Sequence, residues 1–206
     1  MLRVFGICAI VLAMASLSYA SVTGINIADD GDGVIDCSAT LVAVPPDPES
    51  GVDAYVDIIG NHILWDAGHM IGYIHTDTVL DPTIRITNSI DNDTAFSWTG
   101  YTVNIKMPVS FTISNLAFTD ATADWTGSIS QPVLVGSLYT GTLNLLAGTP
   151  VDVDGTLDFK YRIAFSGLTT YSYCQEMIPT PEPATVGLLA VGAMGLVMRR
   201  RRAQQA

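Results

Sequence analysis

The chain of 206 residues carries a formal net charge of −11 at pH 7, and its length is that of one ordinary domain. Between two terminal segments described below, residues 21–178 hold four basic residues against nineteen acidic ones, a formal charge of −15. Such a surface repels nucleic acid and anionic lipid headgroups, so we expect no partner that binds through phosphates.

The N-terminus has the three parts of an export signal. Arg3 is followed by the apolar run Val4–Leu17, and small Ser18 and Ala20 stand where a signal peptidase requires small residues. A buried N-terminal helix is the alternative, but an apolar run without a polar face is more typical of a signal peptide. We predict a signal peptide over residues 1–20, a body over 21–178 and a separate tail over 179–206.

Aspartates and glycines alternate in ADDGDGVIDC, soon after the predicted cleavage site. With Gly33 at the sixth position of an EF-hand-type loop, Asp30 and Asp32 occupy the third and fifth, but the first and twelfth positions are alanines. Asp36 or Asp29 could complete a degenerate site. The stretch therefore gives a weak calcium candidate at Asp30, Asp32 and Asp36, with a solvated acidic turn as the alternative; no other cofactor is expected.

Two cysteines remain once Cys8 leaves with the signal peptide. Cys37 and Cys174 lie near the two ends of the body, and exported chains mature in oxidising compartments where two cysteines usually pair. We predict a Cys37–Cys174 disulfide, with two buried free thiols as the alternative.

Three histidines fall in one segment, NHILWDAGHMIGYIHTD. His69 and His75 would stand roughly 20 Å apart on an extended strand. His62 and His69 could meet across a hairpin, which gives two ligands and a carboxylate such as Asp66. We expect exposed or core-satisfied histidines here rather than a zinc site.

Apolar and polar residues alternate along most of the body. In LDFKYRIAF, residues 157–165, apolar side chains alternate with charged ones, and residues 99–107 repeat the pattern. Further predicted strands include 83–87, 109–114, 133–139 and 142–146. Many short strands with one-sided alternation predict an all-β fold, an antiparallel β-sandwich of the jelly-roll or immunoglobulin-like kind.

Catalytic motifs are missing from the sequence. It has no Gly-x-Ser-x-Gly elbow and no phosphate-cradling glycine loop before a helix, so we expect no enzyme. Trp65, Trp98 and Trp125 could form a platform on which sugar rings stack, although such residues more often belong to a core.

The tail has three parts in order. Pro179, Pro181 and Pro183 precede the apolar segment Ala184–Met198, and Arg199, Arg200, Arg201 and Arg202 follow it. A helix over that segment would be about 22 Å long, short of a hydrocarbon core of about 30 Å. The arginines should stay cytoplasmic, which places the body outside the cytoplasm.

This arrangement of TPEPAT, apolar segment and arginines resembles the PEP-CTERM sorting signal of bacterial exported proteins. The resemblance is confined to the C-terminal tail. It implies that Pro181, Glu182 and Pro183 are recognised by an exosortase, that the apolar segment is a transmembrane helix before processing, and that the arginines are the stop signal. A simple tail anchor is the alternative.

These observations predict an exported protein, anchored in the membrane at least transiently and then located at the cell surface or in the extracellular matrix. The expected partners are signal peptidase, the exosortase and the membrane. We expect a structural or adhesive role for the body. A carbohydrate-binding module for secreted polysaccharide is the alternative function.

Overall fold

The computed structural model describes residues 21–42, 49–119 and 122–182. The predicted signal peptide and the predicted membrane helix lie outside these residues. Within the described part, no helix is long and apolar enough to cross a membrane. The described residues form eleven strands: β1 (Val22–Asp29), β2 (Ile35–Val42), β3 (Ala54–His62), β4 (Gly68–Thr76), β5 (Thr83–Asn92), β6 (Trp98–Met107), β7 (Phe111–Phe118), β8 (Thr126–Val135), β9 (Leu138–Val151), β10 (Thr156–Phe165) and β11 (Thr170–Pro181).

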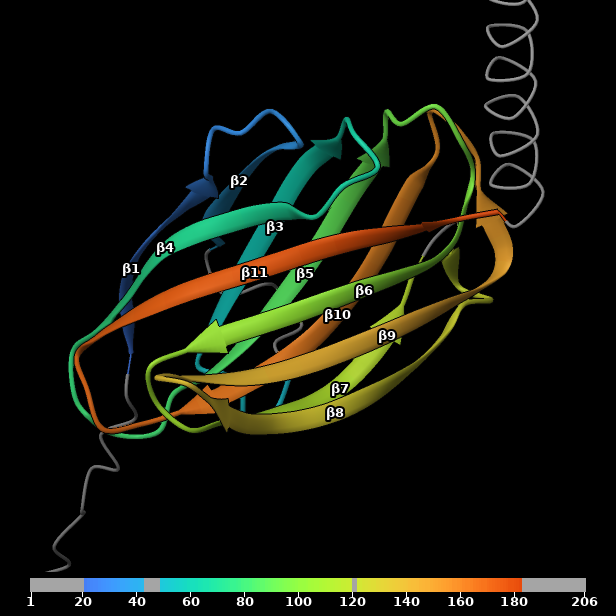
Figure 1. The fold of residues 1–206 in the computed structure, drawn as a ribbon. Coiled ribbons are helices and arrows are strands. Elements are labelled where there is room, and N and C mark those ends of the chain that lie inside the picture. Colours follow the sequence, from blue (N-terminus) through green and yellow to red (C-terminus); the bar gives the residue numbers. More distant parts are fainter. Residues whose placement is uncertain (1–20, 43–48, 120–121, 183–206) are drawn as a thin grey trace, which may run out of the picture.

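All eleven strands belong to a single sheet, in the order β7-β10-β5-β3-β2-β1-β4-β11-β6-β9-β8. The sheet curls round until its edge strands, β7 and β8, face each other, so it is nearly closed and barrel-like (Figure 1). The predicted antiparallel β-sandwich is therefore wrong. The strands form one sheet rather than two stacked ones, and the neighbours β3 and β5 are parallel. Alternation fixes which side of a strand is buried, but a closed sheet and a sandwich bury that side equally well.

A side chain bridges the gap between the two edges. Gln131 of β8 accepts a hydrogen bond from the backbone N–H of Ile113 in β7 at 3.1 Å, and donates one to the Ile113 carbonyl at 2.7 Å. Within the described residues no backbone hydrogen bond joins β7 to β8. The carboxamide of Gln131 thus takes the place of a backbone partner.

The interior is filled by the inward side chains of all parts of the sheet. In β10 every second residue is buried, as its alternation predicts, and β6 shows the same pattern from Tyr101 to Met107. Among the largest fully buried side chains are Trp98, Tyr101, Phe159, Tyr161, Tyr171 and Tyr173. Burial of these aromatic side chains, together with the aliphatic residues of the core, stabilises the fold.

Buried polar groups tie opposite parts of the sheet together across this core. The hydroxyls of Tyr161 and Tyr173 donate to Gln175 Oε1 at 2.8 and 2.7 Å, and Gln175 Nε2 donates to Asn88 Oδ1 at 2.9 Å. These residues come from β10, β11 and β5. Burial raises the pKa values of both phenols, so they stay neutral hydrogen-bonding groups.

The predicted disulfide is wrong: Cys37 and Cys174 are both free thiols. Two strands, β1 and β4, separate β2 from β11, which puts the cysteines roughly 14 Å apart at normal strand spacing and beyond the reach of a disulfide. Cys37 also lies in the core, whereas Cys174 faces an outer depression. Burial raises the pKa of the Cys37 thiol to about 12, which keeps it protonated and unreactive.

Candidate functional site

The last strand of the body runs directly into the predicted sorting motif. β11 extends to Pro181, which pairs with Trp98 of β6, and the N–H of Glu182 donates to the Ser97 carbonyl at 3.2 Å. The sequence boundary between residues 178 and 179 therefore cuts through a strand. Of the predicted sorting residues, Pro181 and Glu182 are described, while Pro183 and the four arginines, Arg199–Arg202, lie outside the described residues.

Two prolines fit this strand because one of its sides is free. β4 pairs with β11 only as far as Met177, whereas β6 pairs with it as far as Pro181. Pro179 and Pro181 thus stand where β11 has a neighbour on one side alone, which is where a strand tolerates proline. The motif begins inside the fold, with no linker before it.

The predicted calcium residues lie in the turn between β1 and β2. Asp29, Asp30 and Asp32 each accept a hydrogen bond from the backbone N–H two residues later, at 2.9, 3.2 and 2.8 Å. Gly31 and Gly33 take positive φ angles of 80° and 77° that such a turn requires. The geometry of the turn is therefore enough to explain why aspartate and glycine alternate here.

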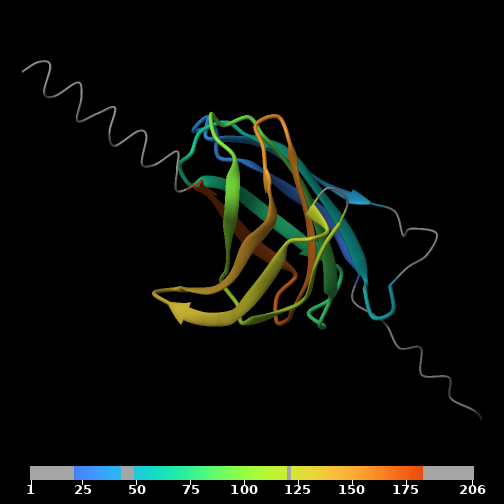
Figure 2. The same ribbon diagram turned by 90° about the vertical axis from the view of Figure 1, so that its right-hand side faces the viewer.

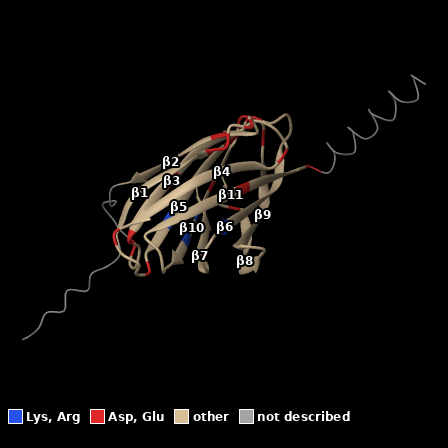
Figure 3. Ribbon diagram, turned by 60° about the vertical axis from the view of Figure 1, so that its left-hand side comes forward, with Lys and Arg blue, Asp and Glu red and all other residues tan. Residues whose placement is uncertain are grey.

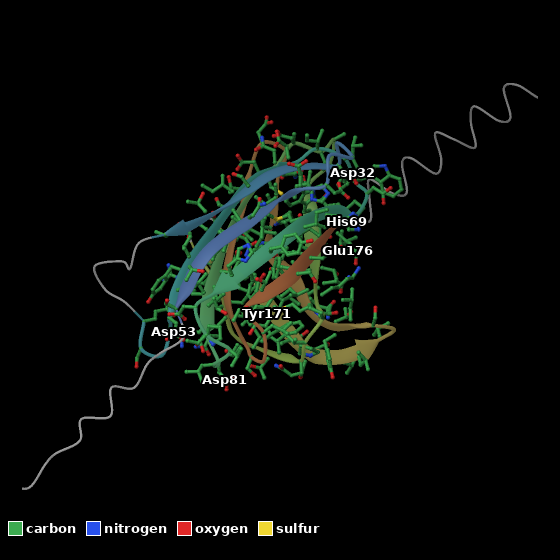
Figure 4. The ribbon with its side chains drawn as sticks, turned by 90° about the vertical axis from the view of Figure 1, so that its left-hand side faces the viewer. Asp32, Asp53, His69, Asp81, Tyr171 and Glu176 are labelled. Carbon is green, nitrogen blue, oxygen red and sulfur yellow. The ribbon has the colours of Figure 1, made fainter. Side chains whose placement is uncertain are left out.

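The structure adds His69 to this turn and leaves Asp36 out. His69 Nδ1 lies 3.6 Å from Asp30 Oδ2 and 4.0 Å from Asp32 Oδ2. Asp36 is exposed on β2, opposite Asn61. One ligand atom from each of Asp30, Asp32 and His69 lies within 4.8 Å of the others, which is close enough to surround a cation. Figure 4 shows Asp32, His69 and Glu176 gathered at one end of the molecule.

A second layer of contacts orients His69. Its Nε2–H donates to Glu176 Oε1 at 3.2 Å, and Glu176 Oε2 accepts from Asn104 Nδ2 at 2.8 Å and lies 3.2 Å from Lys106 Nζ. Burial raises the pKa of Glu176, but the donors from Asn104 and Lys106 outweigh this and lower it, so the group is ionised. With Nε2 donating, Nδ1 directs a lone pair or a second proton toward the aspartates, as in carboxylate–histidine–metal arrangements. Calcium binding at Asp30, Asp32 and Asp36 stays a prediction. The structure brings His69 rather than Asp36 to the two aspartates, and an imidazole nitrogen suits a transition metal such as zinc, whereas calcium takes oxygen ligands.

The other two histidines have separate roles. His62 is fully buried, and its Nε2–H donates to the Asp66 carbonyl at 3.0 Å while Nδ1 accepts from the Tyr101 hydroxyl at 2.6 Å. Burial lowers the pKa of His62, so it is neutral at pH 7. His75 stacks against Tyr73 on the outer surface, with ring centroids 6.4 Å apart. The three histidines do not converge on one ion.

The tryptophans do not form a platform. Trp98 is 0% exposed and Trp125 is 3% exposed, and both donate their indole N–H to internal acceptors. Only Trp65, which is 70% exposed, has its face available to a ligand. The expectation that tryptophans more often belong to a core is confirmed for two of the three.

Sequence reasoning missed a cluster of cations on the outer face of β3, β5 and β10. Glu49 Oε2 accepts from Arg162 Nη2 at 2.6 Å, and Glu49 Oε1 accepts from Lys160 Nζ at 3.1 Å and Arg85 Nη1 at 3.2 Å. The Arg85 guanidinium also lies over the Tyr55 ring, 4.4 Å from its centroid. Donation by Arg162, followed by Lys160 and Arg85, lowers the pKa of Glu49 to about 2. Alternation placed Lys160 and Arg162 on the outer face, but only strand order could bring Arg85 and Glu49 beside them.

All four basic residues of the body contact one of two glutamates. Lys106 pairs with Glu176, and the other three pair with Glu49. The remaining acidic residues of the body are aspartates, and most of those that the structure describes lie at the two ends of the sheet (Figure 3). The surface therefore offers no unpaired lysine or arginine within the described residues.

The outer surface of β1, β4, β11 and β6 holds an open depression of about 400 Å³. Tyr73, Asn26, Lys106, Ser172 and Cys174 are among its lining residues. An exposed aromatic ring, amide, hydroxyl and ammonium groups can bind a polar ligand that has an apolar face.

Comparison with known proteins bears on the tail alone. A search of curated proteins and a search of solved structures each found no match to this chain. The model of one protein family matches residues 179–202, which begin in β11 and continue through the arginines. The match implies that the protein is exported to the cell surface or the extracellular space and is processed by an exosortase. The C-terminal tail of this chain is a PEP-CTERM protein-sorting motif.

Proposed function

We propose that the body is a non-catalytic structural or adhesive module of the cell surface or extracellular matrix. The observation that carries the proposal is that β11 runs directly into the sorting motif: Pro181 pairs with Trp98 of β6, and the N–H of Glu182 donates to the Ser97 carbonyl. A body joined to its sorting motif without a linker is held close to the point of attachment. That arrangement suits a module whose task is to be fixed in place.

The filled interior supports the same proposal. Its large aromatic side chains and hydrogen-bonded polar groups occupy the space that a ligand-binding sheet of this kind would leave open. Contacts of the body are then made by its outer surface. Surface contact, rather than chemistry in an enclosed site, is the mode of action of a structural or adhesive protein.

The test follows the full chain in an exosortase-bearing host, with Pro181 and Glu182 both changed to alanine in one variant. A matched control changes Pro108 to alanine, away from the motif. We expect the parent chain and the control to be retained in the envelope or matrix fraction with a shortened C-terminus, and the double variant to keep its full tail. Mass spectrometry gives the C-terminus. A processed body found only free in the medium would contradict the structural role.

Carbohydrate binding is a second candidate because of one observation. The Tyr73–His75 stack lies beside the open depression, and Tyr73 is half-exposed. A stacked aromatic pair next to amide and hydroxyl groups can pack on the apolar face of a sugar ring. Binding of the full chain to secreted polysaccharide should fall at least several-fold in Tyr73→Ala, and stay unchanged in Trp65→Ala, whose ring does not line the depression. Equal loss in both, or no binding by the parent, would contradict this function.

A further inference from the structure

The tip of the β8–β9 hairpin is apolar and projects from the body. Val133, Leu134 and Val135 are 62%, 59% and 61% exposed, so neither face of this end of β8 is packed. A two-residue turn, Gly136-Ser137, connects β8 to β9, and Gly136 has a positive φ of 65°. Figure 2 shows the hairpin extending away from the rest of the sheet.

This end of β8 is also an open sheet edge. Its inner side pairs with β9 from Val133 to Val135, and Gln131 makes the contact with β7 before the strand reaches this point. Within the described residues no strand pairs with its outer side. Pro132 lies in the bulge that separates the bridged half from the open half. Natural proteins protect such edges with charge, and an apolar edge left open is a template for another strand.

The charge pattern indicates what the other strand belongs to. The sequence has no charged residue between Asp124 and Asp152, a stretch that contains both strands of the hairpin. It is the longest uncharged stretch of a body whose formal charge of −15 repels a second copy. Two copies that meet at the hairpin therefore bring no like charges together.

We propose that two copies of this chain associate edge to edge through Val133–Val135, as antiparallel strands centred on Leu134 about a two-fold axis. An antiparallel pair of identical strands is self-complementary, so the contact closes as a dimer. The exposed valine and leucine side chains of the two copies cover each other on both faces of the joined sheet. The inference extends the proposed structural role, because it supplies a contact between neighbouring modules.

The position of the hairpin leaves it accessible in a tethered protein. β11 delivers the tail beside Trp98, at one end of β6, whereas Tyr139, next to the tip, pairs with Met107 at the other end. The tail and the tip therefore leave the sheet at opposite ends (Figure 1). Three apolar residues per copy are far fewer than the 20 to 30 residues a side of a stable interface. Association is weak in dilute solution and becomes effective where sorting concentrates the copies.

The test uses oxidative cross-linking of the full chain. Leu134→Cys should form a disulfide-linked dimer several-fold more efficiently than Ile59→Cys, because the two Leu134 positions face each other across the axis. Ile59 is a matched control, since it is 64% exposed but lies on the outer face of β3. The parent chain, which keeps its own Cys37 and Cys174, gives the baseline. Higher salt should increase the Leu134→Cys dimer by screening the repulsion between bodies.

Equal cross-linking of the two variants would overturn the proposal. So would cross-links from Leu134→Cys that join only other envelope proteins, or a tip that binds lipid vesicles instead of a second copy. Dimer formation without retention of the body in the matrix would keep the association and contradict the structural role. The two proposals can therefore fail separately.

Discussion

Two exposed surfaces of this acidic protein differ in their charge. One is the outer face of β3, β5 and β10, and the other is the β8–β9 hairpin. On the first, three of the four basic side chains of the body converge on Glu49 and hold the segment before β3 against the sheet. On the second there is no charge, and valine and leucine side chains remain exposed. The protein concentrates its cations where they fix its own chain.

This difference indicates that the surfaces with ion pairs in this molecule serve its internal structure rather than binding. A cation already bound to a glutamate is not available for an anionic ligand, so the charged face is committed to internal structure. The uncharged hairpin has no such internal partner. Changes on the two surfaces should therefore act on different properties, stability on the first and association on the second.

Glu49→Ala should give the largest loss of stability. It leaves the three cations facing one another without the carboxylate that they share, and we expect the free energy of unfolding to fall by about 2–3 kcal/mol. Urea unfolding at pH 7 measures this. Asp36→Ala removes an acid of the same charge that is exposed on β2, and should change stability by less than about 0.5 kcal/mol. Equal effects of the two substitutions would show that the cluster contributes nothing beyond net charge.

Acid should weaken the charged face through the same group. The pKa of Glu49 in the folded protein is about 2, against an ordinary value of 4.5. Because the folded pKa is the lower one, its stabilisation is complete above pH 4.5 and is lost as the pH falls toward 2. We expect this contribution to be about 1–2 kcal/mol, since the pair is partly solvated.

Unfolding of the parent chain and of Glu49→Gln, measured across that pH range, isolates the contribution. The difference in stability between the two chains should shrink as the pH falls. A difference that stays constant down to pH 2 would contradict the assigned role of the Glu49 carboxylate. Both chains share every other ionisable group, so the comparison cancels the contributions of those groups.

The sequence predicts individual strands better than their assembly, with one error among the strands: residues 133–139, predicted as one strand, hold the end of β8, the Gly136-Ser137 turn and the start of β9. The alternation in residues 157–165 identifies β10 and its buried side, because a period of two is a local property. Closure into one sheet depends on which strands are neighbours, and no local pattern carries that information. The same reason explains the wrong disulfide, since Cys37 and Cys174 are separated by two strands that come between β2 and β11 only in the folded order.

The candidate sites show the same contrast between local patterns, which the sequence reveals, and contacts made by strand pairing, which it does not. The proline, glutamate and arginine pattern of the tail is contiguous, so it could be read directly and the family match confirms it. Asp30 and Asp32 are also local, and the sequence places them together. His69 of β4 reaches these aspartates. Glu176 of β11, more than a hundred residues away along the chain, contacts His69. Residues brought in by strand pairing are the ones that sequence reasoning missed.

Gln131→Ala tests the bridged half of β8 and should have a smaller effect than the loss of Glu49. It removes both partners of the Ile113 backbone, and water can replace them in part, so we expect a loss of about 1 kcal/mol. Hydrogen exchange should show faster exchange of the Ile113 amide. Ser130→Ala, at the adjacent exposed position of β8, serves as the control. An unchanged Ile113 amide in Gln131→Ala would show that the sheet is closed by other contacts.

Leu134→Lys should have the smallest effect on the stability of the single chain. Its side chain is already 59% exposed, so a lysine gains a solvated position and loses little packing, and the free energy of unfolding should change by less than about 0.5 kcal/mol. Urea unfolding at low protein concentration gives this value, and analytical ultracentrifugation at high concentration gives the degree of association. If Leu134→Lys leaves association unchanged, the open edge is an inert surface. If it destabilises the single chain as much as Gln131→Ala does, the tip is packed in a way that its exposure does not show, and the contrast with the Glu49 face fails.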